Sequence, residues 1–239
     1  KEWHKVGIEK KSQILIKIGD ELILKSKEIG EQLSREEGKP LAEGIGEVAR
    51  AGQQFQYYGS ECLRLYGEKI PSTRPGFQVE VSREPLGVVG IISPWNFPIA
   101  IPAWKAAPAL MCGNAVILKP ASLTAGSAIA LTEIISNQDI PNGLFNLVLG
   151  SGSDIGNKIA THPDIAAITF TGSVEIGKKL YHDSSPTLKK MQMEMGSKNP
   201  LVVMDDADLQ TAITCAANGA FGGTGQKCTA SSRLIVHEN

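Results

Sequence analysis

Hydrophobic positions in the first third of the chain follow the spacing of amphipathic helices. Apolar side chains recur at three- and four-residue steps between charged ones from Ile14 to Leu33, and Gly38 with Pro40 marks a helix stop. A second helical run covers residues 45–65, and the alternating segment Phe77–Val81 predicts a half-exposed strand. The pattern therefore predicts a helical N-terminal section that ends before a single strand.

Beyond Gly87 the pattern changes to short, wholly apolar runs separated by helical stretches. These runs predict strands at residues 88–92, 115–118, 144–149, 166–170 and 201–204, with helices at about 98–112, 124–137, 153–161 and 173–183. Strands that are apolar on both faces and alternate with helices are typical of a parallel sheet covered on both sides. We therefore predict an α/β fold, a doubly wound parallel sheet with ligands bound at the carboxyl ends of its strands.

Composition and charge narrow the function classes. The chain has 24 Lys and Arg against 25 Asp and Glu and is 42% hydrophobic, which excludes a disordered protein and argues against nucleic acid or a membrane surface as a partner. It lacks a long apolar run or a signal-peptide core, so we expect a soluble, cytoplasmic protein. Four cysteines without a Cys-x-x-Cys pair and four scattered histidines argue against a disulfide scaffold and a metal site.

Two glycine-containing segments follow predicted strands and could face phosphate. Gly150–Gly156 reads G-x-G-x-x-x-G, one residue longer than the dinucleotide fingerprint, so nucleotide binding and a plain strand-to-helix turn both stay open. Gly172–Lys179 matches a P-loop except for its last position, where a lysine cannot replace the hydroxyl that ligates Mg²⁺. That exception disfavours a phosphotransfer enzyme, and Ser173 there is expected to cap a helix, with or without an anion in front of it.

Three residues are candidates for covalent chemistry. Cys228 lies beside Lys227 in a segment of small and polar residues, where the positive charge would favour the thiolate. Glu194, flanked by methionines, is a candidate general base if these partly desolvate it, or else a carboxylate facing water. Asn96, between two prolines, is a candidate oxyanion donor or part of a merely rigid loop. The remaining cysteines are expected in the core: Cys62, Cys112 and Cys215.

Six motifs occur in the order found in the aldehyde dehydrogenase superfamily, and the chain resembles the amino-terminal part of that family. They are Pro94–Pro98, Trp104–Lys105 with Pro108–Leu110, Lys119–Ala121, Phe170–Ser173, Glu194–Gly196 and Gly225–Cys228. The resemblance implies a Rossmann-like cofactor domain and NAD(P)-dependent oxidation of an aldehyde to a carboxylic acid.

The resemblance also implies a role for each catalytic candidate. Cys228 would attack the carbonyl as a thiolate, while the Asn96 side-chain amide and the Cys228 N–H would bind the oxyanion. Glu194 would activate the water that hydrolyses the thioester, which favours hydrolysis over transfer to coenzyme A. A non-catalytic nucleotide-binding or interaction module is the rival, and it is disfavoured because such a module needs none of these three residues.

Cofactor-binding positions are implied at the carboxyl ends of the predicted strands. Lys119 would bind the adenosine ribose, Trp95 would line the site and Ser173 would meet the pyrophosphate. The full set that we expect is Ile92, Ser93, Pro94, Trp95, Lys119, Ala121, Ser122, Gly152, Gly156, Phe170, Thr171, Gly172, Ser173, Met195 and Gly196. NAD-preferring members usually carry a glutamate where this chain has Ser122, so we predict that NADP is accepted.

The resemblance implies how the chain divides. Residues 1–66 and 86–196 would form the NAD(P)-binding domain, 67–85 an oligomerisation hairpin and 197–239 the start of a truncated catalytic domain. We therefore expect a fragment, inactive alone, of a parent that is a homo-dimer or homo-tetramer. Ser197 replaces a family glycine after the base, and Trp104 replaces the arginine typical of succinate semialdehyde oxidisers. Residues 222–230 look most like those of the 2-oxoglutarate semialdehyde (2,5-dioxopentanoate) dehydrogenases, and this resemblance implies that aldehyde as the substrate.

Overall fold

The computed structural model describes residues 2–238 and begins with a group of helices. They are α1 (Glu2–Lys5), α2 (Ile8–Leu24), α3 (Ser26–Glu37) and α4 (Leu41–Glu61), followed by the 3-10 turn η1 (Cys62–Arg64). The first run, predicted as continuous, breaks at Lys25, which leaves helical geometry without a glycine or proline to announce it. Gly38 ends α3 in the left-handed conformation, with φ 93°, as its position predicts.

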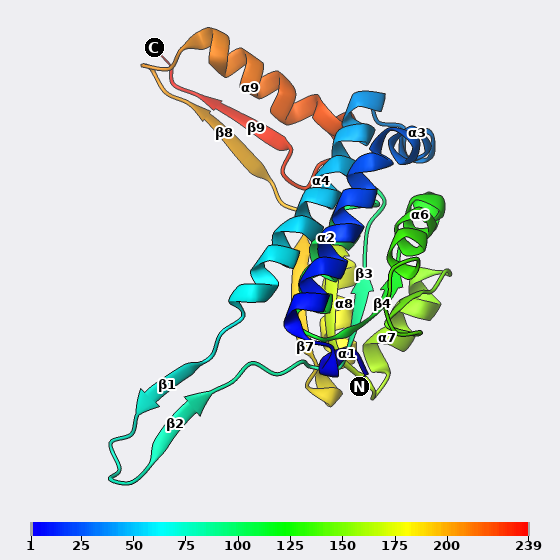
Figure 1. The fold of residues 1–239 in the computed structure, drawn as a ribbon. Helices are drawn as coiled ribbons and strands as arrows, with labels where there is room; N and C mark the ends of the chain where they lie inside the picture. Colours follow the sequence, from blue (N-terminus) through cyan, green and yellow to red (C-terminus); the bar gives the residue numbers. More distant parts are fainter. Residues whose placement is uncertain (1, 239) are drawn as a thin grey trace.

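Helices α2 and α4 cross closely because glycines meet at their contact. A Cβ built on Gly19 would lie 2.6 Å from the carbonyl oxygen of Gly52, and one built on Gly52 would lie equally close to that of Gly19. Neither position therefore tolerates a side chain unless the helices separate. This contact joins the two long helices that lie side by side across the body of the molecule (Figure 1).

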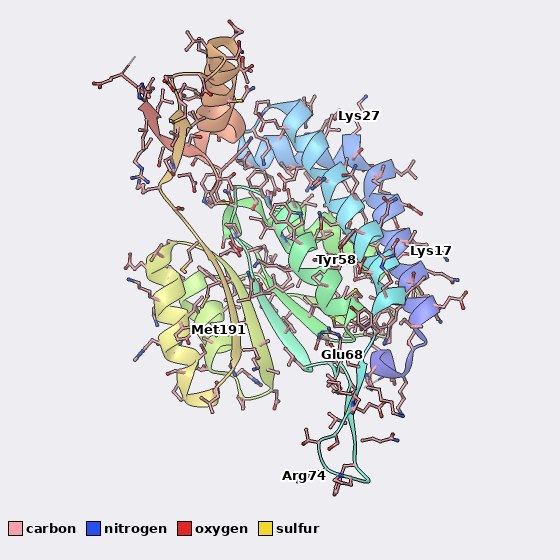
Figure 2. The ribbon with its side chains drawn as sticks, turned by 90° about the vertical axis from the view of Figure 1, so that its left-hand side faces the viewer. Lys17, Lys27, Tyr58, Glu68, Arg74 and Met191 are labelled. Atoms are coloured by element: carbon pink, nitrogen blue, oxygen red, sulfur yellow. The ribbon has the colours of Figure 1, made fainter. Side chains whose placement is uncertain are left out.

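A hairpin leaves the body after the helices. Strands β1 (Glu68–Pro71) and β2 (Gln78–Val81) pair antiparallel and extend away from the other elements, as the cyan ribbon in Figure 1 shows. Arg74 lies at its far end and Glu68 nearer the body (Figure 2). Every residue of both strands is exposed, including Ile70 and Val79.

The central sheet is parallel throughout, which confirms the predicted fold class. Its strands run in the order β5-β4-β3-β6-β7, and each neighbouring pair is parallel. The strands are β3 (Val88–Ile92), β4 (Ala115–Lys119), β5 (Phe145–Leu147), β6 (Ile165–Gly172) and β7 (Lys190–Met195). Their connections contain α5 (Ala100–Met111), α6 (Ala125–Ser136), α7 (Asn157–Thr161) and α8 (Val174–Ser184).

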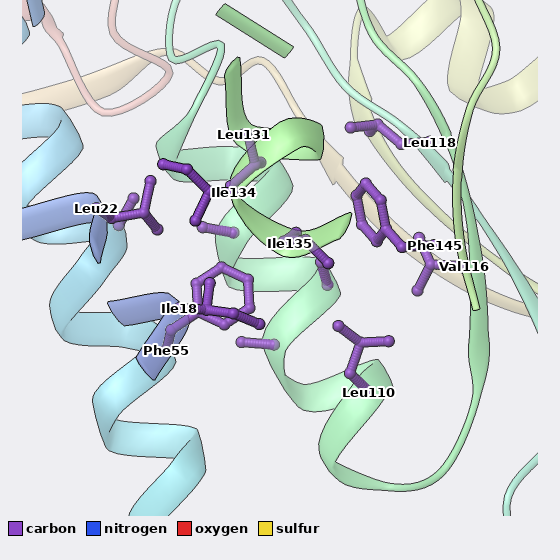
Figure 3. Packing of buried hydrophobic residues seen from close by; sticks show 14 of the residues in the cluster. Ile18, Leu22, Phe55, Leu110, Val116, Leu118, Leu131, Ile134, Ile135 and Phe145 are labelled. Carbon is purple, nitrogen blue, oxygen red and sulfur yellow. The ribbon is translucent and has the colours of Figure 1, made fainter. Parts of the chain in front are cut away.

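Each face of the sheet has its own hydrophobic cluster. The larger cluster joins strand residues such as Ile91 and Leu118 to α2, α4, α5 and α6, and Figure 3 shows Phe55 and Ile18 facing Ile134 within it. The smaller cluster joins Ile168 to α7 and α8 on the opposite face. Burial on both faces is the reason that the central strands read as continuous apolar runs.

Two sequence expectations about strands and one about a helix are corrected by the structure. The apolar run 201–204 belongs to β8 (Asn199–Val203), which pairs with β9 (Ser231–Val236) in a separate two-stranded parallel sheet beside α9 (Leu209–Phe221). The fifth strand of the central sheet is instead β7, which was not predicted. The helix expected at 153–161 begins as a π-helical turn, η3 (Gly152–Gly156), before α7.

The cysteines divide by burial. Cys62 is buried and Cys112 half-buried, and burial raises the pKa of both thiols. Cys215 is exposed on α9, so its expected place in the core is wrong. Within residues 2–238, no group of three or more His, Cys, Asp or Glu side chains is arranged to hold a metal ion. No helix in the same part of the chain is both long and apolar enough to cross a membrane.

Candidate active site

The site candidates gather at one edge of the central sheet. Because all its strands are parallel, their carboxyl ends meet there, and the predicted residues lie at those ends or in the loops that follow. β3 leads to Asn96, β4 ends at Lys119, β6 ends at Gly172, and β7 carries Glu194. The chain thus brings together side chains that are far apart in sequence.

A cavity of about 540 Å³ opens beside this edge. Its walls come from α5, β6, β7 and the segment after α9, so it lies between the sheet and the cysteine-bearing loop. The lining residues are Ile101, Trp104, Lys105, Pro108, Thr169, Thr171, Gln192, Glu194, Cys228 and Thr229. The candidate nucleophile and the candidate base therefore line one cavity.

Glu194 faces this cavity from an edge strand. Residues of β7 alternate in burial, so Met193 and Met195 pack into the smaller hydrophobic cluster while Gln192 and Glu194 are exposed on the other face. The expectation that flanking methionines partly desolvate Glu194 is therefore wrong, because neighbours in a strand point to opposite sides.

A hydrogen-bonded chain links Glu194 to a lysine on α5. The Lys105 ammonium donates to Thr169 Oγ1 at 2.7 Å and to Gln192 Oε1 at 2.9 Å, and Gln192 Nε2 donates to Glu194 Oε1 at 3.1 Å. An ammonium can only donate and a carboxylate can only accept, so this order fixes the orientation of the Gln192 amide. Burial lowers the pKa of Lys105 to about 8, against the opposing attraction of Glu194.

Cys228 lies on a loop with unusual backbone geometry. The preceding 3-10 turn, η5 (Gly222–Gly225), contains Thr224 at φ 57°, a rare conformation for a residue with a side chain. After the turn, Asn199 Nδ2 donates to the Cys228 carbonyl at 2.7 Å. Cys228 itself is exposed. The neighbouring Lys227 ammonium lies 3.9 Å from Glu43 on α4, so this charge is paired across the chain.

Asn96 connects the sheet to the cysteine loop. Its Nδ2 donates to the carbonyl oxygen of Gln226 at 2.6 Å, although 130 residues separate the two. Its Oδ1 is buried and has no hydrogen-bond partner in the described structure. The side-chain amide therefore already lies against the segment that carries the candidate nucleophile, two residues before Cys228.

Several cofactor candidates lie at the ends of β3 and β4, along the same edge of the sheet. Lys119 is buried at the end of β4, where burial lowers its pKa, and its ammonium donates to the Pro120 carbonyl at 2.8 Å. The Ser93 hydroxyl, at the end of β3, is buried without a partner in the described residues. Ser122 is exposed and donates to the Gly150 carbonyl at 3.4 Å. A buried ammonium and an orphaned hydroxyl at one edge fit the polar groups of a dinucleotide.

Glycine and helix geometry add to this fit. A Cβ at Gly152 would meet no atom within 4 Å, so this backbone is open to a ligand, whereas Gly156 lies beside Ile92. At α8, Ser173 Oγ accepts from the Ile176 N–H at 3.3 Å and caps the helix as predicted. The P-loop alternative gains nothing, because β6 runs to Gly172 and α8 starts at Val174 with no wide loop between them.

The remaining cofactor candidates differ in exposure. Ile92 and Phe170 are buried in the smaller cluster, where the Phe170 ring would meet a Cβ at Gly172 within 2.5 Å. The others surround the carboxyl edge in partly buried or exposed positions: Pro94, Trp95, Ala121, Thr171, Met195 and Gly196.

Sequence reasoning missed polar partners that the fold brings to the site. Lys105 was quoted only as part of a motif, and its polar partner Gln192 was not singled out. Nor was the buried pair of Lys39 and Glu47 below the Asn96 segment, 2.6 Å apart. The alternation of β7 places Gln192 and Glu194 on the same face, which could have suggested the contact between these two side chains. Lys39 and Glu47 carry no such signal in their local sequence.

Comparison with known proteins places these features in context. The family model described as the aldehyde dehydrogenase family matches residues 1–239. The chain is 40% identical over 240 residues to 2,5-dioxopentanoate dehydrogenase of Saccharolobus solfataricus, covering 100% of this chain and 50% of that protein. It is 45% identical over 234 residues to alpha-ketoglutaric semialdehyde dehydrogenase of Bacillus subtilis, covering 98% of this chain and 48% of that protein.

The solved structures agree. An NADP-dependent enzyme of E. coli matches with a TM-score of 0.97 at 36% identity, covering 99% of this chain and 49% of the other. The chain thus spans about half the length of the relatives that it matches.

Proposed function

The chain belongs to the aldehyde dehydrogenase family, and from this premise we propose that it forms the cofactor-binding part and nucleophile loop of an enzyme that oxidises an aldehyde to a carboxylic acid with NAD or NADP. The observation that carries the proposal is that Cys228 and Glu194 line one cavity while the Asn96 amide contacts the Cys228 segment. A binding module would need no such arrangement.

In the proposed reaction, the first covalent step belongs to Cys228. Its thiolate adds to the aldehyde carbon, forming a C–S bond and a negatively charged oxygen. The Asn96 Nδ2–H and the Cys228 backbone N–H donate to this oxyanion, and one such donor contributes about 2.7–4 kcal/mol to the stability of the transition state. When NAD or NADP is bound at the carboxyl edge, it would accept the hydride that leaves the aldehyde carbon as the oxyanion collapses to a carbonyl, and that carbon stays attached to the Cys228 sulfur as a thioester.

Hydrolysis of the thioester is assigned to Glu194. Its carboxylate takes a proton from a water molecule as that water attacks the thioester carbon, and the Cys228 thiolate leaves when the C–S bond breaks. The hydrogen bond from Gln192 at 3.1 Å orients the carboxylate, and the Lys105 ammonium at the far end of the chain supplies a positive charge nearby. Gln192 and Lys105 are thus assigned to orienting Glu194.

We assign the dinucleotide to the carboxyl edge of the sheet. Lys119 and Ser93 would hold polar groups of the adenosine part, and the N-terminus of α8 at Ser173 would face the pyrophosphate. Ser122 places no carboxylate next to a 2′-phosphate, so NADP is accepted. Residues 67–85 are assigned to contacts between subunits, because the hairpin exposes Ile70 and Val79 far from the body.

The proposed substrate is a semialdehyde such as 2-oxoglutarate semialdehyde. The support comes from the names of the two similar enzymes and from Trp104, which lines the cavity at the position where the family resemblance implies an arginine in enzymes that oxidise succinate semialdehyde. The test uses the full-length gene product with 2-oxoglutarate and succinate semialdehydes, following NAD(P)H formation.

We expect faster turnover of 2-oxoglutarate semialdehyde and complete dependence on Cys228. Cys228→Ala loses turnover while still binding NADP⁺, whereas Cys215→Ala, a change at another exposed cysteine, keeps it. Glu194→Gln forms about one equivalent of NAD(P)H rapidly and then turns over about 10²–10⁴-fold more slowly. Turnover that survives in Cys228→Ala would refute the proposal. The 239-residue chain alone is expected to form no NAD(P)H.

A further inference from the structure

A buried ion pair of Lys39 and Glu47 lies against the Asn96 segment, and a second buried carboxylate, that of Glu37, lies 3.9 Å from the Lys39 ammonium. Lys39 follows the left-handed Gly38 that ends α3, and Glu47 lies in α4. Lys39 Nζ and Glu47 Oε2 are 2.6 Å apart, and their side chains are 1% and 2% exposed. Two charges removed from water this completely are retained only where further hydrogen bonds satisfy them.

Those further hydrogen bonds all go to one short stretch of backbone. Lys39 Nζ donates to the Asn96 carbonyl oxygen at 2.8 Å, and Glu47 Oε1 accepts from the Ile99 and Ala100 N–H groups at 3.0 and 3.1 Å. The Lys39 ammonium also lies 4.2 Å from the centre of the Phe97 ring. The pair therefore holds the segment on both sides of Phe97, including the N-terminus of α5.

Asn96 is consequently held from two directions. Its backbone carbonyl is bound from behind by Lys39, while its side-chain Nδ2 reaches forward to the Gln226 carbonyl on the nucleophile loop. The prolines on either side restrict the segment but leave the carbonyl of residue 96 free to rotate about its own torsions. Lys39 and Glu47 supply the contacts that fix it.

We propose that Lys39 and Glu47 are positioning residues for the reaction, which hold the Asn96 backbone so that its side-chain amide reaches the loop that carries Cys228. The inference rests on the proposed function. Neither is assigned a contact with substrate or cofactor. Lys39 acts on the Asn96 carbonyl directly, and Glu47 acts through Lys39 and through the backbone of Ile99 and Ala100. A donor displaced by about 1 Å loses much of its value to a transition state, so the pair affects the acylation rate.

A double-mutant cycle in the full-length gene product separates positioning from general stability. The measured quantity is the rate of the first NAD(P)H burst after rapid mixing with saturating 2-oxoglutarate semialdehyde, in the wild type, Lys39→Met, Asn96→Ala and the double variant. We expect Asn96→Ala to slow the burst about 10²–10³-fold and Lys39→Met about 10–100-fold. In the Asn96→Ala background, Lys39→Met should slow it less than about twofold.

Lys25→Met controls for the loss of a lysine ion pair elsewhere in the helices, because Lys25, at the end of α2, pairs with Glu21 at 2.7 Å in a more exposed position. It should leave the burst unchanged. If Lys39→Met fails to fold, Lys39→Met/Glu47→Gln removes both charges and keeps an acceptor oxygen for Ile99 and Ala100, and it enters the same cycle. Cofactor affinity should stay within about twofold in all folded variants.

The outcomes distinguish the two proposals. Equal slowing by Lys39→Met in the presence and absence of the Asn96 side chain would overturn the positioning role and leave the enzyme assignment intact. A wild-type protein that forms no NAD(P)H with any aldehyde would overturn the proposed function, and the positioning role with it. Loss of the Lys39 effect in the Asn96→Ala background supports both.

Discussion

The central sheet and the region after it are built differently. In β3–β7 and their helices, residues such as Ile91 and Leu118 are completely buried, and both faces of the sheet are covered. In β8, α9 and β9, which extend from the body in Figure 1, α9 buries none of its residues and exposes Phe221. One region is held by a hydrophobic core, and the other mainly by its own hydrogen bonds.

This difference runs through the candidate site. Glu194, Lys105 and the cofactor edge belong to the packed region, where the buried strands and α5 position them although Glu194 itself is exposed. Cys228 belongs to the other region, and its described links to the packed part are polar: the bond from Asn96 to the Gln226 carbonyl and the contact of Lys227 with Glu43. The base and the cofactor edge are therefore organised by the core, whereas the nucleophile depends on a few polar contacts.

The largest expected effect tests this contrast with one substitution in each region. Phe55, on α4, is fully buried in the larger hydrophobic cluster, so Phe55→Ala should lower the free energy of unfolding of the 239-residue chain by about 3–5 kcal/mol. Phe221 is 78% exposed, so Phe221→Ala should change it by less than about 0.5 kcal/mol. Urea unfolding measures both.

The same two substitutions in the full-length gene product show whether the exposed region is covered there. If Phe221→Ala lowers the free energy of unfolding strongly in that protein while the effect of Phe55→Ala stays the same, the region of β8, α9 and β9 is buried by the rest of that protein. Comparable costs for the two substitutions in the 239-residue chain would contradict the division into a packed and an exposed region.

A smaller effect concerns the pH dependence of stability at Lys105. Burial lowers the pKa of Lys105 from 10.5 to about 8, so between these pH values the unfolded chain binds more protons than the folded one. Wild-type stability should therefore rise from pH 8 to pH 10.5 by about 2 kcal/mol more than that of Lys105→Met, after allowing for partial solvent screening.

The control is Trp104→Leu, which alters the neighbouring cavity residue without removing a titratable group. It should keep the wild-type dependence on pH in parallel urea titrations. Identical slopes for the wild type and Lys105→Met would show that Lys105 is hydrated in solution, and the packed side of the site would then be looser than its hydrogen bonds to Thr169 and Gln192 indicate.

Sequence patterns predicted the elements that are buried on both faces. β3, β4 and β6 appear as continuous apolar runs because helices cover both sides of the sheet there. β7 was not predicted because it is an edge strand with one face open to the cavity, so its polar and apolar residues alternate instead of forming an apolar run. The run 201–204 predicted a strand correctly, but an apolar run does not say with which sheet it pairs.

The candidate site was predictable where a motif carried it and unpredictable where the fold created it. Cys228, Glu194 and Asn96 stood out from their local sequence and their order along the chain. The contacts of Lys39 with Asn96 and of Lys105 with Gln192 span 57 and 87 residues. No periodicity reports such a pairing, since it exists only once helices and strands have packed.

The smallest expected effect tests whether the packed region binds cofactor by itself. Ser122→Glu adds a carboxylate beside the end of β4, where it would repel the 2′-phosphate of NADP⁺ and leave NAD⁺ largely unaffected. We expect the affinity ratio of NADP⁺ to NAD⁺ to fall about tenfold, or about 1.4 kcal/mol. Ser122→Gln, of similar size and without charge, is the matched control.

Titration of the 239-residue chain by the fluorescence of Trp95 and Trp104 measures both affinities. Saturable binding with the expected change would mean that the core alone organises the cofactor edge, whereas binding only by the full-length protein would mean that this edge, like Cys228, needs contacts from outside the packed region.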